Sequence, residues 1–275
     1  MQHMRAASRQ AVADARDRLY RYLDDVAESE AERLGEELFA VVDLLLAEHV
    51  LRRHLADPAS SAVGKNRLLQ SVFGRAVGKP TLDLLSGLVG SRWSRTRDLA
   101  DSTEMLGQLA ILAVAQKQGA IEDVEDELFR VGRLIDREPR LRALLADLTV
   151  PAQRRVELLR SVLSGKVHPV TERQLVRAVQ APQGRGLDRA AEELAELAAA
   201  SRERSVAKVS TPVGLDDDQQ RRLTEALSRF YRRPIGLQVE LRPELVGGLV
   251  VRVGDEVIDG SVASRLANAA RGLPS

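Results

Sequence analysis

Apolar residues recur every three or four positions along most of the first 204 residues, and this spacing predicts helices. A leading helix is expected at about residues 8–28. The next helix carries its apolar stripe at Leu34, Leu38, Val41, Val42 and Leu45. Each helix therefore has one apolar face, and such helices bury these faces by packing into a bundle.

The helical part contains an internal repeat. Glu37-Leu38-Phe39 recurs 90 positions later as Glu127-Leu128-Phe129. Residues 34–102 and 124–192 align without a gap, and about a third of the positions are identical. Repeated segments of this kind form similar structural units. The sequence thus predicts two all-helical bundles in tandem, with a helix at about residues 102–118 that closes the first bundle and opens the second.

Several residues mark the ends of helices within each copy. The residue before a proline is pushed out of the helical region, so Asp57-Pro58 ends a helix. Thr81 follows Gly78-Lys79-Pro80 and is predicted to cap the next helix, as is its repeat counterpart Thr171.

After about residue 204 the apolar pattern changes from helical to alternating. Strands are predicted at residues 206–211, 237–241, 249–253 and 256–258, with a Gly-Asp hairpin turn before the last of these. The acidic run at residues 216–218 suits the start of a helix, and a metal site is the less favoured alternative. The predicted fold class is mainly α: two tandem helical bundles (residues 1–115 and 116–204) followed by a small α+β domain (residues 205–275).

Composition narrows the range of functions. The net charge is +1 and the basic residues are interleaved with acids, so nothing favours a nucleic-acid partner. There are no cysteines, which excludes disulfides and thiolate metal sites. No apolar run is long enough to cross a bilayer.

Motifs for catalysis are missing from the chain. The nearest approach to a phosphate-binding loop, at residues 74–80, is one residue too short and has proline where a hydroxyl is needed. His49 and His54 are five positions apart, so they do not share one helix face as a metal pair would. We therefore predict no catalytic residue, no cofactor and no metal.

One stretch near the C-terminus carries a family resemblance. Residues 243–262 read PELVGGLVVRVGDEVIDGSV, followed by Arg265-Leu266. This ordered run resembles the C-terminal signature of ATP synthase delta subunits, whose mitochondrial counterpart is the oligomycin-sensitivity-conferring protein. Its candidate residues are Gly247, Gly248, Gly254, Asp255, Asp259, Gly260, Ser261 and Arg265.

Physically, these candidate residues have structural roles. The paired glycines permit close approach of the backbone, while Gly254 and Gly260 are expected at positive φ. Asp259 or Ser261 is expected to cap a final helix that carries Val262 and Leu266.

The resemblance implies a non-catalytic stator component that links the catalytic head to the peripheral stalk. The implied partners are the N-terminal helices of the alpha subunits and the b-type stalk subunits. Leu19, Tyr22 and Val26 are candidate contacts for the alpha subunits. Membrane association, at the cytoplasmic face of the cell membrane, would come only through the complex.

The duplicated bundle departs from the usual single bundle and resembles the long actinobacterial forms of the family. It leaves open which copy docks to the head. Two other classes stay as alternatives. One is a generic helical-repeat adaptor unrelated to energy conversion, and the other is an enzyme whose active site is not recognised.

Overall fold

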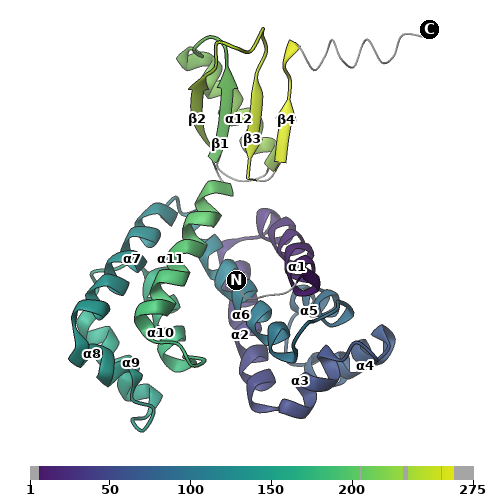
Figure 1. Ribbon diagram of the computed structural model, residues 1–275, viewed down its shortest axis with the longest axis vertical. Helices are drawn as coiled ribbons and strands as arrows, with labels where there is room; N and C mark the ends of the chain where they lie inside the picture. Colours follow the sequence, from purple (N-terminus) through teal and green to yellow (C-terminus); the bar gives the residue numbers. More distant parts are fainter. Residues whose placement is uncertain (1–5, 205, 232–234, 255, 263–275) are drawn as a thin grey trace. The chain divides into compact units, whose positions relative to one another are not determined.

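The computed structural model describes residues 6–204, 206–231, 235–254 and 256–262. The chain divides into two compact units, residues 1–198 and 199–275, and each is described by itself. The first unit is helical and the second holds the sheet (Figure 1). The chain is therefore mainly α with a C-terminal α+β part, as predicted.

Eleven helices follow one another in the described part of the chain before the first strand. They are α1 (Ala6–Asp25), α2 (Glu28–Ala47), α3 (His49–Ala56), α4 (Ala62–Phe73), α5 (Lys79–Gly90), α6 (Thr96–Lys117), α7 (Ile121–Arg137), α8 (Pro139–Ala146), α9 (Ala152–Leu163), α10 (Pro169–Gln180) and α11 (Leu187–Arg204). At a shift of 90 residues, α1 to α6 correspond in order to α6 to α11. The last helix of the first copy is therefore also the first helix of the second.

Helix α6 is buried on all sides because both copies pack against it. It lies against α1, α2, α3 and α5 of the first copy and against α7 and α10 of the second. Together these helices share one hydrophobic core. This arrangement confirms the prediction of a shared helix. The predicted division at residues 115 and 116 falls within α6 and stays a prediction.

The start of α6 was predicted about six residues too late. The helix begins at Thr96, and its first turn holds Asp98, which is fully buried. The Ser8 hydroxyl donates to Asp98 Oδ2 at 2.8 Å, and Arg95 pairs with Oδ1 at 3.0 Å. Because these partners satisfy the carboxylate, the polar first turn of α6 can be buried. The apolar pattern alone predicted that these residues lie outside the helix.

Helices α2 and α6 approach each other closely through two glycines. A Cβ at Gly35 would lie 2.7 Å from the side chain of Ile111, and a Cβ at Gly107 would lie 2.6 Å from the ring of Phe39. The missing side chains make room for Phe39, which is only 4% exposed. A larger residue at position 107 would displace this ring.

A glutamate fixes the start of one helix in each copy. Glu37 Oε2 accepts hydrogen bonds from the Gly78 amide (2.8 Å) and the Thr81 hydroxyl (2.5 Å). In the second copy, Glu127 Oε2 accepts the same two bonds from the His168 amide (2.8 Å) and the Thr171 hydroxyl (2.6 Å).

The prediction that Thr81 and Thr171 are N-caps was therefore wrong. Pro80 and Pro169 occupy the first turns of α5 and α10, so these helices begin two residues before the threonines. Proline is well suited to that position because it has no N–H to satisfy. The threonine hydroxyls instead bind the glutamate of the preceding α2 or α7.

We expect Glu37→Gln to lower the free energy of unfolding by about 1–3 kcal/mol at pH 7, because it weakens charge-assisted hydrogen bonds. Burial raises the pKa of Glu37, but the hydrogen bonds from Thr81, Gly78 and Arg33 outweigh burial and lower the pKa below its ordinary value. Because its pKa is lowered in the folded state, the ionised Glu37 carboxylate stabilises the fold at pH values above its ordinary pKa of 4.5. This stabilisation is lost as the pH falls through the pKa of the folded state.

Urea denaturation across the range of pH 3–7, followed by circular dichroism, measures this effect. Asp83→Asn, at an exposed position on α5, is the control and should stay within about 0.5 kcal/mol of the parent. A difference between Glu37→Gln and the parent that does not shrink at low pH would contradict the assignment.

After the end of α11, the described residues of the second unit form a four-stranded sheet and one further helix. The strands are β1 (Val206–Thr211), β2 (Gly236–Leu241), β3 (Val250–Val253) and β4 (Glu256–Asp259), in the order β2-β1-β3-β4. β1 is parallel to β2 and antiparallel to β3, which pairs with β4. Helix α12 (Asp217–Tyr231) covers one face (Figure 1). The core between them contains Ala207, Val209, Leu227, Ile235, Val251 and Val253.

The acidic run before α12 starts the helix, as expected. Asp216 Oδ1 accepts from the Gln219 amide at 2.7 Å, and the Gln219 side chain accepts from the Asp216 amide at 3.0 Å. Asp217 and Asp218 follow in the first turn, where the helix dipole favours negative charge.

Candidate docking surfaces

The paired glycines of the signature bring two backbone segments into contact in the second unit. The amide of Val262 donates to the Gly247 carbonyl at 2.9 Å, and the amide of Gly260 donates to the Leu249 carbonyl at 3.0 Å. Gly248 has φ of +82°, and a Cβ there would lie 2.4 Å from the Gly260 carbonyl oxygen. Only glycine fits a position that combines this backbone conformation with such close approach.

The remaining described signature residues also shape the backbone. Gly254 has φ of +58° in the turn between β3 and β4. Positive φ was wrongly predicted for Gly260, which lies outside that region. A Cβ at Gly260 would lie 3.2 Å from the Leu249 carbonyl oxygen, so close approach is what this position requires. Asp259 accepts from the Ser261 amide at 2.9 Å.

Two signature residues, Asp255 and Arg265, lie outside the described residues, as does the predicted final helix beyond Val262. In the described part, exposed apolar side chains flank the glycines. Val246 is 85% exposed, Val257 on β4 is 49% exposed and Val262 is 37% exposed. The second unit therefore presents apolar side chains beside the close backbone contacts of the glycines.

The three candidate contacts for an alpha subunit differ in accessibility. Leu19 is fully buried, so its side chain packs inside the bundle and cannot meet a partner. Tyr22 and Val26 are partly exposed at the end of α1 and in the link that follows it. Burial and the nearby carboxylates of Glu30 and Glu37 raise the pKa of the Tyr22 hydroxyl. This places Tyr22 beside α2.

A buried ion cluster joins the two copies. The Arg177 guanidinium on α10 pairs with both oxygens of Glu104 on α6, at 3.0 and 2.7 Å. It also reaches Asp43 on α2 at 2.8 Å and lies over the ring of Phe39, 4.8 Å from its centroid. One turn earlier on α10, Arg173 pairs with Glu32 and Glu36 of α2. The α6–α10 face of the second copy is thus covered by α2.

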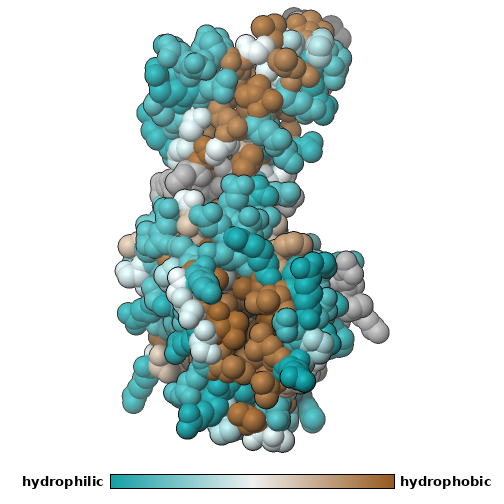
Figure 2. Space-filling view, turned by 90° about the vertical axis from the view of Figure 1, so that its left-hand side faces the viewer, coloured by the Kyte–Doolittle hydropathy of each residue, from teal (hydrophilic) through white to brown (hydrophobic). Residues whose placement is uncertain are grey.

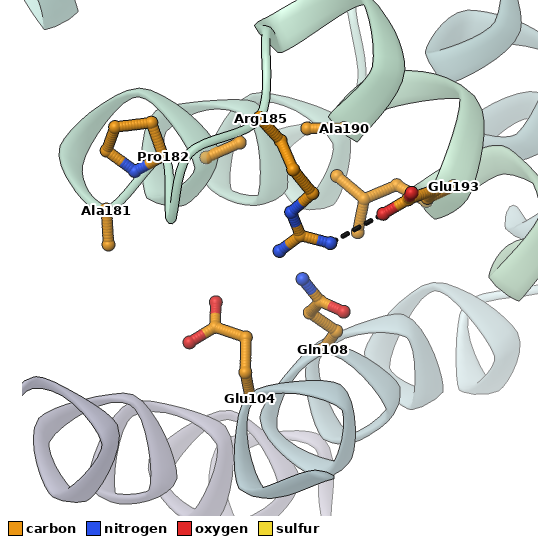
Figure 3. A pocket seen from close by; sticks show the side chains of 9 residues that line it. Glu104, Gln108, Ala181, Pro182, Arg185, Ala190 and Glu193 are labelled. Carbon is orange, nitrogen blue, oxygen red and sulfur yellow. Dashed lines mark hydrogen bonds and ion pairs between the residues drawn. The ribbon is translucent and has the colours of Figure 1, made fainter. Parts of the chain in front are cut away.

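A small cavity lies between α6, α10 and α11 (Figure 3). Glu104 and Gln108 line one side, and Arg185, paired with Glu193 at 2.5 Å, lines the other. The space open to water measures about 30 Å³. A cavity of this size holds a few water molecules and is far too small for a nucleotide.

Two other kinds of site are missing from the described residues. None of the described helices combines the length and apolarity needed to cross a bilayer. Likewise, the described part of the chain contains no group of three or more histidines and carboxylates able to hold a metal ion.

The described chain combines a duplicated helical bundle, joined by the shared helix α6, with a small α+β unit that exposes apolar side chains, and none of its described helices could span a membrane. Comparison with known proteins identifies the family. Residues 108–273 match the model of the family described as "ATP synthase delta (OSCP) subunit". The chain belongs to this family, and its role is that of a stator subunit of ATP synthase.

Relatives match the whole length, including the first copy. The ATP synthase subunit delta of Streptomyces griseus is 48% identical over 98% of both chains. The subunit of Streptomyces coelicolor is 46% identical over 100% of both. A chain in the cryo-EM structure of the Toxoplasma gondii mitochondrial ATP synthase hexamer is 20% identical, with a TM-score of 0.33, covering 61% of this chain and 96% of that one. The long form with two copies is therefore shared with the streptomycete subunits.

Proposed function

We propose that the chain is the non-catalytic link between the catalytic head of ATP synthase and its peripheral stalk. The helical unit binds N-terminal helices of the alpha subunits, and the second unit binds b-type stalk subunits. Contact with the cytoplasmic face of the cell membrane comes through the complex. A generic adaptor unrelated to energy conversion is not supported, because the chain belongs to the delta family over its length.

The observation that carries the docking proposal is the unequal cover of the two copies. In the second copy, α2 lies across α6 and α10 and forms the ion pairs of Arg173 and Arg177. The repeat counterparts of α6 and α10 are α1 and α5, where Asp17, Arg21 and Asp83 are exposed at the counterparts of Gly107, Ile111 and Arg173. A helix from the head can take the place on α1 and α5 that α2 takes on α6 and α10.

The surface of α1 indicates what kind of contact this is. Where α6 has Gly107 and Ile111 facing α2, α1 has the exposed residues Asp17 and Arg21 at the counterpart positions. Tyr22 and Val26 add apolar surface at the end of α1. A helix docked here is therefore held by charged contacts along α1 and by apolar contacts at its end, so salt should weaken the binding.

Native mass spectrometry tests the link directly. The full chain is mixed with a catalytic head that lacks its delta subunit. Binding of one copy per head supports the proposal. An intact head that binds no copy would overturn it, because a stator subunit must hold the head against the torque of the rotor.

We expect Tyr22→Ala and Val26→Ala each to weaken binding to this head by roughly tenfold, since partly exposed aromatic and apolar side chains carry much of an interface's energy. The control is Val63→Ala on α4, where Val63 is 63% exposed. Thermal unfolding of each variant verifies the fold. Equal binding of all three variants would exclude the end of α1 as the docking site.

A further inference from the structure

An aromatic side chain on α7 is exposed where its repeat counterpart is buried. Phe129 is 57% exposed, whereas Phe39 on α2 is 4% exposed. Figure 2 shows the side of the molecule that carries α7, α8 and α9, where an apolar area of the helical unit is surrounded by hydrophilic residues. The exposed large apolar side chains on these helices and the loops that join them are Phe129, Leu134, Leu144 and Leu148.

The counterpart surface in the first copy shows what such a face binds. On α2, Glu32 and Glu36 pair with Arg173, and Phe39 lies under Arg177 one turn further along. The two arginines are four residues apart on α10, so they follow one face of that helix. The α2 face is therefore a receptor for another helix, which the second copy supplies.

Most of this receptor is repeated on α7. At a shift of 90 residues, Glu32 corresponds to Glu122, Glu36 to Asp126 and Phe39 to Phe129. All three counterparts are exposed. Within the described residues, the carboxylates of Glu122 and Asp126 form no ion pair. The same chemistry thus lies on α7 without the helix that covers it in the first copy.

The two copies also differ at the position that makes room for Phe39. Phe39 enters the space left by Gly107 on α6, where a Cβ would lie 2.6 Å from the ring. The counterpart of Gly107 is Leu197 on α11, which packs against the core. A leucine at this position leaves less room for a neighbouring ring than Gly107 leaves for Phe39, which agrees with the exposure of Phe129.

The copies also differ where Arg177 binds. Glu104, its main partner, corresponds to Leu194, and Asp43 corresponds to Arg133. A second cation would meet Arg133 on α7, and like charges repel. The α7 face therefore suits a helix with one basic residue that pairs with Glu122 and Asp126. One turn later, this helix would need an apolar residue that packs on Phe129.

We propose that Glu122, Asp126 and Phe129 form a docking site for such an amphipathic helix from another subunit of ATP synthase. Copies joined head to tail each contribute one half of the interface between them, and α7 carries the half that α2 contributes in the first copy. A second copy of this chain is a poor occupant. Its α5 has Asp83 and Gly87 at the counterparts of Arg173 and Arg177, and Asp83 would face two carboxylates.

Photo-crosslinking in the assembled ATP synthase tests this site. A benzophenone amino acid replaces Phe129 in one sample and Leu134 in a matched control; Leu134 is 43% exposed on a different side of the same helix. We expect position 129 to crosslink to one other subunit, in a peptide that has Lys or Arg followed four residues later by an apolar residue. The double change Glu122→Lys with Asp126→Lys should lower this yield roughly tenfold.

Other outcomes overturn the proposal. These are equal crosslinking from positions 129 and 134, no crosslink from 129, a crosslink to this chain itself, or a yield that does not respond to charge reversal. The site rests on assembly of the chain into ATP synthase, so a third crosslinker at Tyr22 serves as a reference. A crosslink to the head from position 22 without one from position 129 would reject the α7 site and leave the proposed link intact.

Discussion

Replacing Glu104 with alanine should lower the free energy of unfolding by about 3–5 kcal/mol, because it leaves a buried guanidinium without its main partner. The side chain of Arg177 is 8% exposed and that of Glu104 is 5% exposed. Asp43 stays within reach of Arg177 but is 57% exposed, so water screens much of its attraction. The loss should therefore disrupt the packing of α10 against α2 as well as α6.

Denaturant unfolding of the full chain measures this loss. Replacing both members, Glu104→Leu with Arg177→Leu, removes the buried charges together and should recover most of the stability. Glu193→Ala is the matched control, because its pair with Arg185 is about one-third exposed and should contribute less than about 1 kcal/mol. A loss for Glu104→Ala no larger than that of the control would show that the cluster does not stabilise the fold.

A single methyl group at position 248 should destabilise the second unit by about 2–4 kcal/mol. Gly248→Ala places a Cβ 2.4 Å from the Gly260 carbonyl oxygen and holds alanine at a φ of +82°. Both segments are backbone, so neither can move aside without breaking the bond from the Val262 amide to the Gly247 carbonyl. The free energy of unfolding of a small unit is only a few kcal/mol, so this unit should be unfolded in a large fraction of the molecules.

Hydrogen exchange resolved by residue separates this local effect from a global one. Amides of β1 and β3 should exchange faster in Gly248→Ala, whereas amides of α6 should keep their protection. Gly214→Ala makes the same chemical change where no atom lies within 4 Å of the new Cβ, so exchange should not change. Equal exchange in both variants would mean that the paired glycines are not required for the fold.

Much of the fold could be predicted because the local pattern and the tertiary structure agree. Leu34 and Leu38 repeat at helical spacing and are buried. Val206 begins an alternating run that is a strand in the sheet. The 90-residue repeat predicted two similar bundles and their shared helix. The family signature was also readable, since an ordered run of glycines and acids reflects close backbone contacts.

What the sequence could not show depends on contacts between distant residues. Thr81 has the chemistry of a cap, but its hydroxyl binds Glu37, 44 residues away. The apolar stripe that contains Leu19 could face either the core of the bundle or a partner, and only the tertiary packing shows that Leu19 is buried. The α7 site could be inferred only from the sequence repeat and the structure together. The repeat pairs Phe129 with Phe39, and the structure shows that Phe129 is exposed and Phe39 is covered.

The shared helix α6 sets the unit in which this protein can gain or lose length. Because the end of one bundle is the beginning of the next, each added copy needs five helices and 90 residues, and a bare bundle needs six. Removing any continuous stretch of 90 residues within the repeat should therefore leave a chain that still folds as one complete bundle with a hybrid core. Such a deletion would return the duplicated form to the single-bundle form without making a new junction between helices.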